Sequence, residues 1–294
     1  MNRGSRLVWL ALLAACGPCR QEPVVCEGPR TLDVAPGGVT LVAGDCIDMD
    51  LRAQALGDGS LEVELIEVDG AVVPVVTAGS GGAVLEAVVL EGPVTLDGNE
   101  RVRIWKQGYQ SWWWSGVTEL EDVEFGDDGL PVAGGDGDGM SSVDETPFTS
   151  WWLGLAGRHD GASVLLGALQ VTRTKLYVAF SEDHAWAVWG GRGEAIDLAE
   201  GEQVELDPLW MDASSDPVDL HRSYAQAALD HGGLSARTDL PPTGWATWYQ
   251  FYSEVTEDDV RSNLEVAADI EDEGRAAGEK NGFLHGGFGA IGQA

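Results

Sequence analysis

Residues 61–76 read LEVELIEVDGAVVPVV, and this stretch decides the fold class. Apolar and acidic residues alternate over residues 61–68, as they do in a strand with one buried side and one side in solvent. Asp69-Gly70 favours the tight turn of a β-hairpin, and the apolar run 71–76 supplies the returning strand. The stretch therefore predicts an antiparallel hairpin.

Short apolar runs of the same kind continue on both sides of this hairpin, over about residues 28–215. Turns rich in Gly, Asp and Asn separate them, and many of the 40 glycines lie in these turns. The runs predict further strands at residues 83–90, 102–105, 162–171, 175–180, 185–189 and 203–206. Many short strands with such turns favour a β-sandwich over an α/β fold. We therefore expect a mainly β chain with a large β-sandwich domain over residues 28–215.

Helical signals begin only after the β region. Asp216 is expected to cap a helix that has Pro217 at its first position and ends at Gly232. Its apolar stripe is Leu220, Tyr224, Ala227 and Ala228. After the connector that ends at Pro241-Pro242, residues 243–249 predict a buried strand. Thr256-Glu-Asp-Asp259 then predicts the capped start of a second helix, with an apolar stripe of Val260, Leu264, Ala267 and Ala268.

The first 27 residues are expected to be an export signal followed by a tether. Arg3 and Arg6 precede a nine-residue apolar run at 7–15, which is too short to span a bilayer but fits a secretory signal peptide. The run ends in Leu13-Ala-Ala-Cys16, which resembles the lipobox of bacterial lipoproteins. The resemblance implies cleavage before Cys16, acylation of this residue, and a membrane-anchored lipoprotein exported to the cell envelope. The lipoprotein signal peptide is then residues 1–15, and residues 16–27 are a tether; the alternative is an ordinary signal peptide with a chance cysteine.

The other cysteines agree with export. Cys26 and Cys46 flank a segment with strand and turn character, and in an oxidising compartment they most simply form a disulfide. A loop of this size predicts a stabilisation of about 3 kcal/mol. Cys16-Gly-Pro-Cys19 copies a redox motif, but its place at a cleavage site argues against redox chemistry.

Charge and the remaining motifs exclude several function classes. With 49 Asp+Glu against 17 Lys+Arg, the net charge of −32 argues against nucleic-acid partners. Asp136 and Asp138 in the acidic segment 126–138 could bind calcium, but a solvated loop is the better interpretation. The GxGxxG at 287–292 has no helix after it to bind a dinucleotide. We expect no metal or other cofactor, and His184 and His221 are expected to be ordinary surface or core residues.

Three stretches carry a family resemblance. They are residues 108–112 (GYQSW), residues 216–231, and residues 241–249 (PPTGWATWY) with the helix start that follows. Together they resemble the family 36 glycoside hydrolases, chiefly α-galactosidases; Thr247 stands where serine is commoner. The resemblance implies a β-sandwich, a linker helix and connector at 216–240, and the start of a TIM (β/α)8 barrel from residue 241.

The family implies retaining hydrolysis of terminal α-galactosides by two aspartates, with their carboxyl groups about 5–5.5 Å apart. These aspartates lie at the ends of later barrel strands. Residues 243–294 number 52, whereas a TIM barrel needs about 250, and no Asp or Glu follows Glu279. The expectation is a truncated barrel start with an atypical tail at 241–294 and no catalytic residue in this chain. The alternatives are a carbohydrate-binding or structural surface lipoprotein, and a fragment that barely folds.

Tryptophan supplies the candidate sugar contacts, with 12 of these residues in the chain. Sugar faces carry C–H groups that stack on aromatic rings. The candidates are Trp248 and Tyr249 near the end of the first barrel strand, Trp112 and Trp113, and the pair Trp151-Trp152. The competing interpretation is that these rings fill the sandwich core and domain interfaces. The partners implied are α-galactoside-containing glycans and a membrane reached through the lipid anchor, and a homo-oligomer stays open.

Overall fold

The computed structural model describes residues 28–108, 115–133, 146–159, 161–191, 193–235, 256–263 and 265. The chain divides into two compact units, residues 1–235 and 236–294. Among the described residues, no helix combines the length and the apolar character needed to cross a bilayer.

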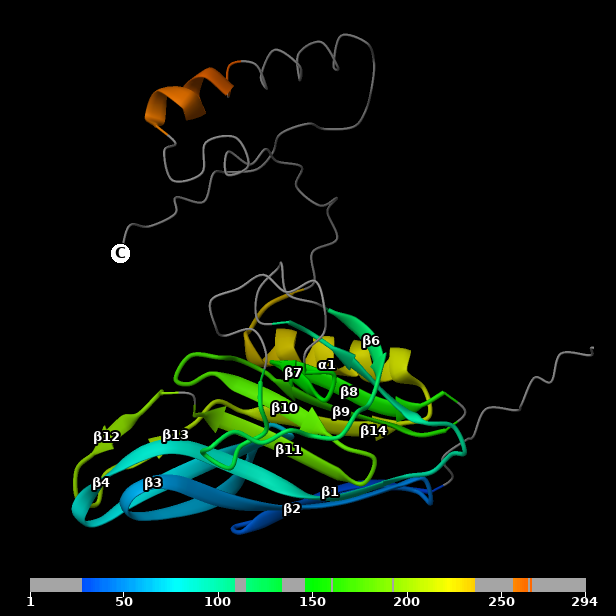
Figure 1. The fold of residues 1–294 in the computed structure, drawn as a ribbon, viewed down its shortest axis with the longest axis horizontal. Coiled ribbons are helices and arrows are strands. Elements are labelled where there is room, and N and C mark those ends of the chain that lie inside the picture. Colours follow the sequence, from blue (N-terminus) through cyan, green and yellow to red (C-terminus); the bar gives the residue numbers. More distant parts are fainter. Residues whose placement is uncertain are drawn as a thin grey trace, which may run out of the picture. The chain divides into compact units, whose positions relative to one another are not determined.

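The described part of the first unit is mainly β, with one helix, α1 (Pro217–His231) (Figure 1). Its strands are β1 (Arg30–Ala35), β2 (Gly38–Ala43), β3 (Ile47–Val68), β4 (Ala71–Leu96), β5 (Val102–Lys106), β6 (Gly116–Glu119), β7 (Thr149–Trp151), β8 (Leu153–Arg158), β9 (Ser163–Ala168), β10 (Leu176–Phe180), β11 (His184–Gly190), β12 (Ile196–Leu198), β13 (Gln203–Glu205) and β14 (Leu209–Ser214). The strands expected between residues 28 and 215 are present.

The strands form a β-sandwich of two antiparallel layers. Sheet I has the order β1-β2-β3-β4-β11-β10-β7, and sheet II has the order β14-β9-β8-β5-β6. The two sheets join where Leu209 of β14 pairs with Val72 of β4. The short strands β12 and β13 pair with other parts of β4, which at 26 residues is the longest strand.

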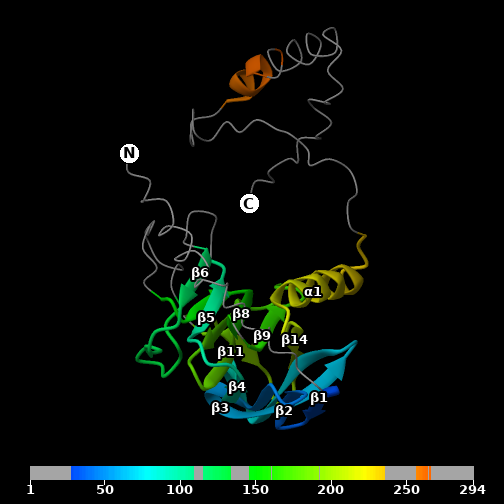
Figure 2. The same ribbon diagram turned by 90° about the vertical axis from the view of Figure 1, so that its right-hand side faces the viewer.

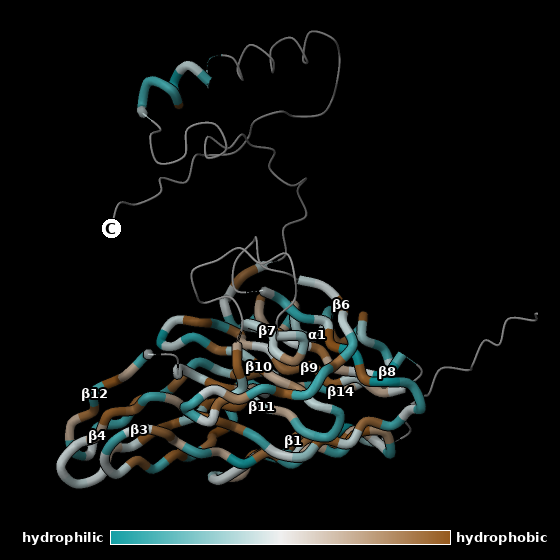
Figure 3. The backbone as a smooth tube through the Cα atoms, viewed as in Figure 1, coloured by the Kyte–Doolittle hydropathy of each residue, from teal (hydrophilic) through white to brown (hydrophobic). Residues whose placement is uncertain are grey.

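Both faces of β10 are covered, and the sequence pattern shows why. In β10, Leu176, Val178 and Phe180 enter the core between the sheets, whereas Tyr177 and Ala179 face outward into a second apolar cluster. Successive side chains of a strand point to opposite faces, so a continuous apolar run buries both. Hydropathy alternates more visibly along β3 and β4 (Figure 3), where part of one face is exposed.

The hairpin expected at residues 61–76 is confirmed, within the longer pair β3–β4. Val68 pairs with Ala71, so the turn has two residues between its strands. Asp69 and Gly70 have φ values of 51° and 78°, which the turns that match the twist of a hairpin require.

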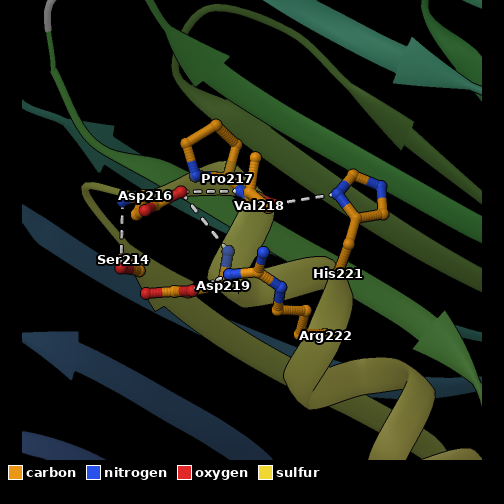
Figure 4. A network of polar contacts seen from close by, with 7 residues as sticks. All are labelled: Ser214, Asp216, Pro217, Val218, Asp219, His221 and Arg222. Carbon is orange, nitrogen blue, oxygen red and sulfur yellow. Dashed lines mark hydrogen bonds and ion pairs between the residues drawn. The ribbon is translucent and has the colours of Figure 1, made fainter.

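Helix α1 begins and ends where the capping residues predicted. The Asp216 carboxylate accepts hydrogen bonds from the Val218 and Asp219 backbone N–H groups at 2.8 and 3.3 Å. Figure 4 shows this cap together with the contact of 2.9 Å between His221 Nδ1 and the Pro217 carbonyl oxygen. Gly232 is the C-cap. The cap satisfies N–H groups that the first turn of a helix leaves without partners.

One side of α1 packs on the outer face of sheet II, along β9 and β14 (Figure 2). Leu220 is buried there with Leu165 and Trp210, and Tyr224 packs against the same cluster. The Tyr224 hydroxyl donates to the Ala168 carbonyl oxygen at 2.6 Å. The expected apolar stripe is therefore the side that the sandwich buries.

In the second unit, residues 257–263 and 265 are helical. Thr256 and Asp259 form the expected capping pair: the Asp259 backbone N–H donates to Thr256 Oγ1 at 3.3 Å, and the Thr256 backbone N–H donates to Asp259 Oδ2 at 2.9 Å. The hydrogen bonds from Thr256 lower the pKa of Asp259. The expected strand at 243–249, and with it the barrel start, lies outside the described residues.

Segment 120–133 corrects one expectation. The sequence favours a solvated acidic loop at 126–138, yet Leu130 and Ala133 are buried against the outer face of sheet I. The Tyr177 hydroxyl donates to the Pro131 carbonyl oxygen at 3.1 Å and holds the segment there. The segment packs there because apolar residues lie between its acidic ones. They bury the outward-facing apolar side chains of β10 and β11.

An ion pair joins β1 to β14. Titration of its buried carboxyl makes the free energy of unfolding depend on pH. Arg30 pairs with Asp212, whose side chain is only 1% exposed. Burial raises the pKa of Asp212, although the Ala213 N–H and Arg30 act in the opposite direction. A carboxyl with a raised pKa is protonated more readily in the folded chain than in the unfolded one. The free energy of unfolding therefore falls as the pH rises from about 3.8 through the folded-state pKa.

We expect Asp212→Asn to flatten this pH dependence, because it removes the titrating group. Urea unfolding at about pH 4 and about pH 7 measures the difference. Asp33→Asn, an exposed carboxyl on β1, is the control and should retain the wild-type slope. An unchanged slope in Asp212→Asn would show that other groups set the pH dependence.

Candidate functional site

The chain passes from one sheet to the other at Trp152. Strand β7 pairs with β10 in sheet I, and β8 pairs with β5 and β9 in sheet II. Trp152 is the single residue between β7 and β8. In β-sandwiches, strands that switch sheets do so at bends or bulges, so Trp152 is the corner of the fold.

The backbone at this corner is strained. Trp152 has a φ of 64°, in the left-handed region that glycine adopts freely and a bulky residue rarely does. Hydrogen bonds on both sides hold it there, from the Trp152 N–H to the Leu176 carbonyl oxygen at 3.1 Å and from the Ala168 N–H to the Trp152 carbonyl oxygen at 2.7 Å. Such a conformation costs on the order of 1–3 kcal/mol, and residues of this kind concentrate at binding and catalytic sites.

An aromatic platform supports the Trp152 ring. Its centroid lies 5.5 Å from that of Trp151, and Trp151 lies 5.4 Å from Tyr177. Trp151 and Tyr177 are buried in the outer cluster of sheet I, whereas Trp152 is partly exposed at its rim. Buried neighbours restrict the Trp151 ring, so the corner presents an aromatic surface of fixed orientation.

The ends of segment 109–114 lie beside this corner. The Trp151 N–H donates to the Gln107 carbonyl oxygen at 3.0 Å, and the Gln107 N–H donates to Ser150 Oγ at 2.8 Å. Across the base of the segment, the Gly108 N–H donates to Ser115 Oγ at 2.9 Å. Strands β5 and β6 form a hairpin, and the residues that flank its connection, Gly108 and Ser115, are hydrogen-bonded to each other close to where Gln107 contacts Trp151.

Most residues expected to form the site lie outside the described residues. This holds for Trp112, Trp113, Trp248 and Tyr249, for Cys16 and Cys26, and for Asp136 and Asp138. Cys46 is described and buried, and its carbonyl oxygen accepts from the Asp97 N–H at 2.8 Å. Its disulfide with Cys26 stays a prediction. The described residues contain no group of three or more His, Cys, Asp or Glu arranged to hold a metal ion.

His184 and His221, which were expected to be surface or core residues rather than ligands, each pack against a tryptophan. His221 lies with its ring centroid 4.9 Å from that of Trp105, in an edge-to-face contact between α1 and sheet II. His184 is partly exposed and packs on Trp186, with the ring centroids 4.4 Å apart. Sequence alone named the pair Trp151-Trp152, but no local pattern indicated that Trp152 turns the chain between two sheets.

The corner can supply stacking contacts rather than proton transfer. Indole rings offer large faces for C–H groups, and the neighbouring Ser150 hydroxyl already accepts from the Gln107 N–H and donates to the Leu153 carbonyl oxygen. The described geometry therefore suits binding of a ligand with an apolar face and polar edges.

No protein-family model matches the chain, and no curated protein matches its sequence. Among solved structures, it is similar to an α-galactosidase from Thermus thermophilus in complex with stachyose, at 18% identity and a TM-score of 0.37 over 82% of this chain and 41% of that one. The same enzyme in complex with p-nitrophenyl α-D-galactopyranoside gives 22% identity and a TM-score of 0.34, over 74% and 39%. The chain thus spans about two fifths of the length of these structures. At TM-scores below 0.5, inference about function has to come from this chain's own residues.

Proposed function

We propose that the chain is part of an α-galactosidase-like glycoside hydrolase that acts on terminal α-galactosides, with the sandwich corner at Trp152 contributing to recognition of the sugar. Three motifs in one order support this proposal: residues 108–112, the linker helix at 216–231 and residues 241–249. Gln107, which precedes the first motif, is hydrogen-bonded to Trp151 at the corner, and the second motif coincides with α1 and its N-cap. The parent activity is retaining hydrolysis, for which the resemblance places the two aspartates on later barrel strands. The activity proposed for these 294 residues is therefore binding.

The observation that carries the proposal is the strain at Trp152. Glycine would occupy a φ of 64° without cost, whereas tryptophan is strained there, which points to a role for its ring. This ring is partly exposed, and the Trp151 backbone next to it is hydrogen-bonded to Gln107, one residue before the GYQSW motif. A galactose unit has a face of C–H groups that suits such a surface. Trp248 and Tyr249, in the second unit, remain proposed sugar contacts.

Calorimetric titration of the 294-residue chain tests this proposal. We expect raffinose and stachyose, which end in α-galactose, to bind, and lactose, which ends in β-galactose, not to bind. Trp152→Gly removes the ring and relieves the backbone, so it should stay folded and lose at least about tenfold in affinity, or about 1.4 kcal/mol. Trp105→Phe, on the outer face of sheet II, is the matched control and should bind like the wild type.

Absence of raffinose and stachyose binding would contradict the proposal. Equal binding of lactose would instead favour the second candidate, a general carbohydrate-binding surface protein. The observation behind this alternative is that residues 1–235, which contain the sandwich, form a compact unit by themselves.

In either case we propose export and membrane anchoring through lipidated Cys16, which the sequence around residues 13–16 supports.

A further inference from the structure

Six residues on the outer face of sheet I, away from the corner, form what we call the outer patch: Asp50, Arg52, Glu91, Phe125, His184 and Trp186. The strand register brings them together. Arg52 of β3 pairs with Glu91 of β4, and Glu91 pairs on its other side with Trp186 of β11. Their chain neighbours Leu51, Leu90, Ala185 and Ala187 point into the core, so alternation directs these side chains outward.

An exposed ring forms the apolar part of the patch. Phe125 is 51% exposed, although its ring centroid lies 5.7 Å from that of Trp186. The backbone bridge between Phe125 and Pro131 and the hydrogen bond from the Gly126 N–H to the Leu130 carbonyl oxygen, 2.9 Å, hold its position. Its segment is therefore anchored while one face of the ring meets solvent.

Oriented polar groups lie next to Trp186, along the paired strands β11, β4 and β3. Glu91 Oε2 accepts from Trp186 Nε1 at 2.7 Å and lies 3.9 Å from His184 Nε2, and the Glu91 side chain is still 45% exposed. Asp50 Oδ2 accepts from Arg52 Nη2 at 2.9 Å. Asp50 Oδ1 is buried and has no hydrogen-bond partner within the described part of the chain. Buried polar atoms without partners are uncommon and call for an explanation.

A flat sheet face with a fixed aromatic ring, two carboxylates and a guanidinium group has the chemistry that binds a neutral sugar. The ring takes the C–H face, the carboxylates accept from hydroxyl groups, and Arg52 donates to them. Anions fit poorly, because the patch carries two carboxylates on a chain of net charge −32.

We propose that the outer patch is a second carbohydrate-binding site, which takes neutral polysaccharide chains. It lies on other strands than the corner: β10 lies between β11, which carries Trp186, and β7, which leads to Trp152, and Trp186 and Trp152 border the same apolar cluster. The inference does not depend on the corner's preference for α-galactosides. The site holds a polymer by its internal units, whereas the corner recognises a terminal unit.

Affinity electrophoresis of the full 294-residue chain in gels that contain guar galactomannan tests the outer patch. We expect the wild type to be retarded, Phe125→Ala to lose at least about tenfold in affinity, and Glu91→Gln to lose several-fold. Because Phe125 is half exposed, its removal should leave the fold intact, which circular dichroism checks. Val117→Ala is the matched control, since Val117 is 59% exposed on β6 of sheet II, and its mobility should equal that of the wild type.

Raffinose titration separates the two sites. Phe125→Ala should bind raffinose like the wild type, and Trp152→Gly should keep part of its galactomannan retardation. If the wild type is not retarded, or if Phe125→Ala and Glu91→Gln run like the wild type, the outer patch is not a binding site. Retardation lost in Phe125→Ala while the wild type binds no raffinose would support the outer patch and contradict the proposed function.

Discussion

Replacing Trp189 by alanine is expected to lower the free energy of unfolding of the sandwich by about 3–5 kcal/mol, the range found for large aromatic residues removed from cores. Trp189 is 0% exposed and lies on β11 in the core between the two sheets. Its Nε1 donates to the Asp207 carbonyl oxygen at 2.8 Å. The cavity left behind is bounded by paired strands, which cannot collapse into it without breaking their register.

Trp189→Phe separates packing from the hydrogen bond. It retains most of the ring volume but leaves the Asp207 carbonyl oxygen without its donor, so we expect a loss of about 1–3 kcal/mol. The Asp207 carboxylate itself accepts from the Thr172 and Arg173 N–H groups at 2.8 and 2.9 Å. Urea unfolding followed by circular dichroism measures both variants. A loss below about 1 kcal/mol in Trp189→Ala would show that this core repacks more freely than its strand framework suggests.

Gly92→Ala is the second substitution with a large expected effect, although it adds only one methyl group. A Cβ at position 92 would lie 2.0 Å from the backbone oxygen of Asp50 and 3.1 Å from the Cα of Leu51. These atoms belong to the backbone of β3, so no side-chain rotation can relieve the overlap. Strands β3 and β4 would have to separate at the middle of sheet I, and we expect a loss of about 3 kcal/mol.

Gly37→Ala is the matched control for this substitution. Gly37 lies in the turn between β1 and β2, and a Cβ there meets no atom within 4 Å. Its stability should stay within about 0.5 kcal/mol of the wild type. Equal stability of Gly92→Ala and Gly37→Ala would show that β3 and β4 adjust their spacing easily. Gly92 is next to Glu91, so the loss in the free energy of unfolding also reports how strongly the pairing of β3 and β4 holds the outer patch.

Part of the candidate site was accessible from sequence. Residues 108–112 and the pair Trp151-Trp152 stand out as motifs, and the structure places the Gln107–Gly108 end of the first next to the second. The strain at Trp152 was not accessible, because it arises where β7 and β8 pair with different sheets. The packing of Leu130 on sheet I was not accessible either, because it depends on which strands present apolar side chains to the segment expected to be a solvated loop at 126–138.

The sequence by itself determined the strands and the ends of α1, because both depend on local chemistry. Alternation over residues 61–68 and the turn at Asp69-Gly70 specify the hairpin, and the Asp216 carboxylate caps a helix within its own first turn. Only the tertiary structure decided which strands are neighbours. Arg52, Glu91 and Trp186 are far apart in the chain and meet because backbone hydrogen bonds set the register of β3, β4 and β11. Period-two patterning states which face a side chain takes, but not which strand lies beside it.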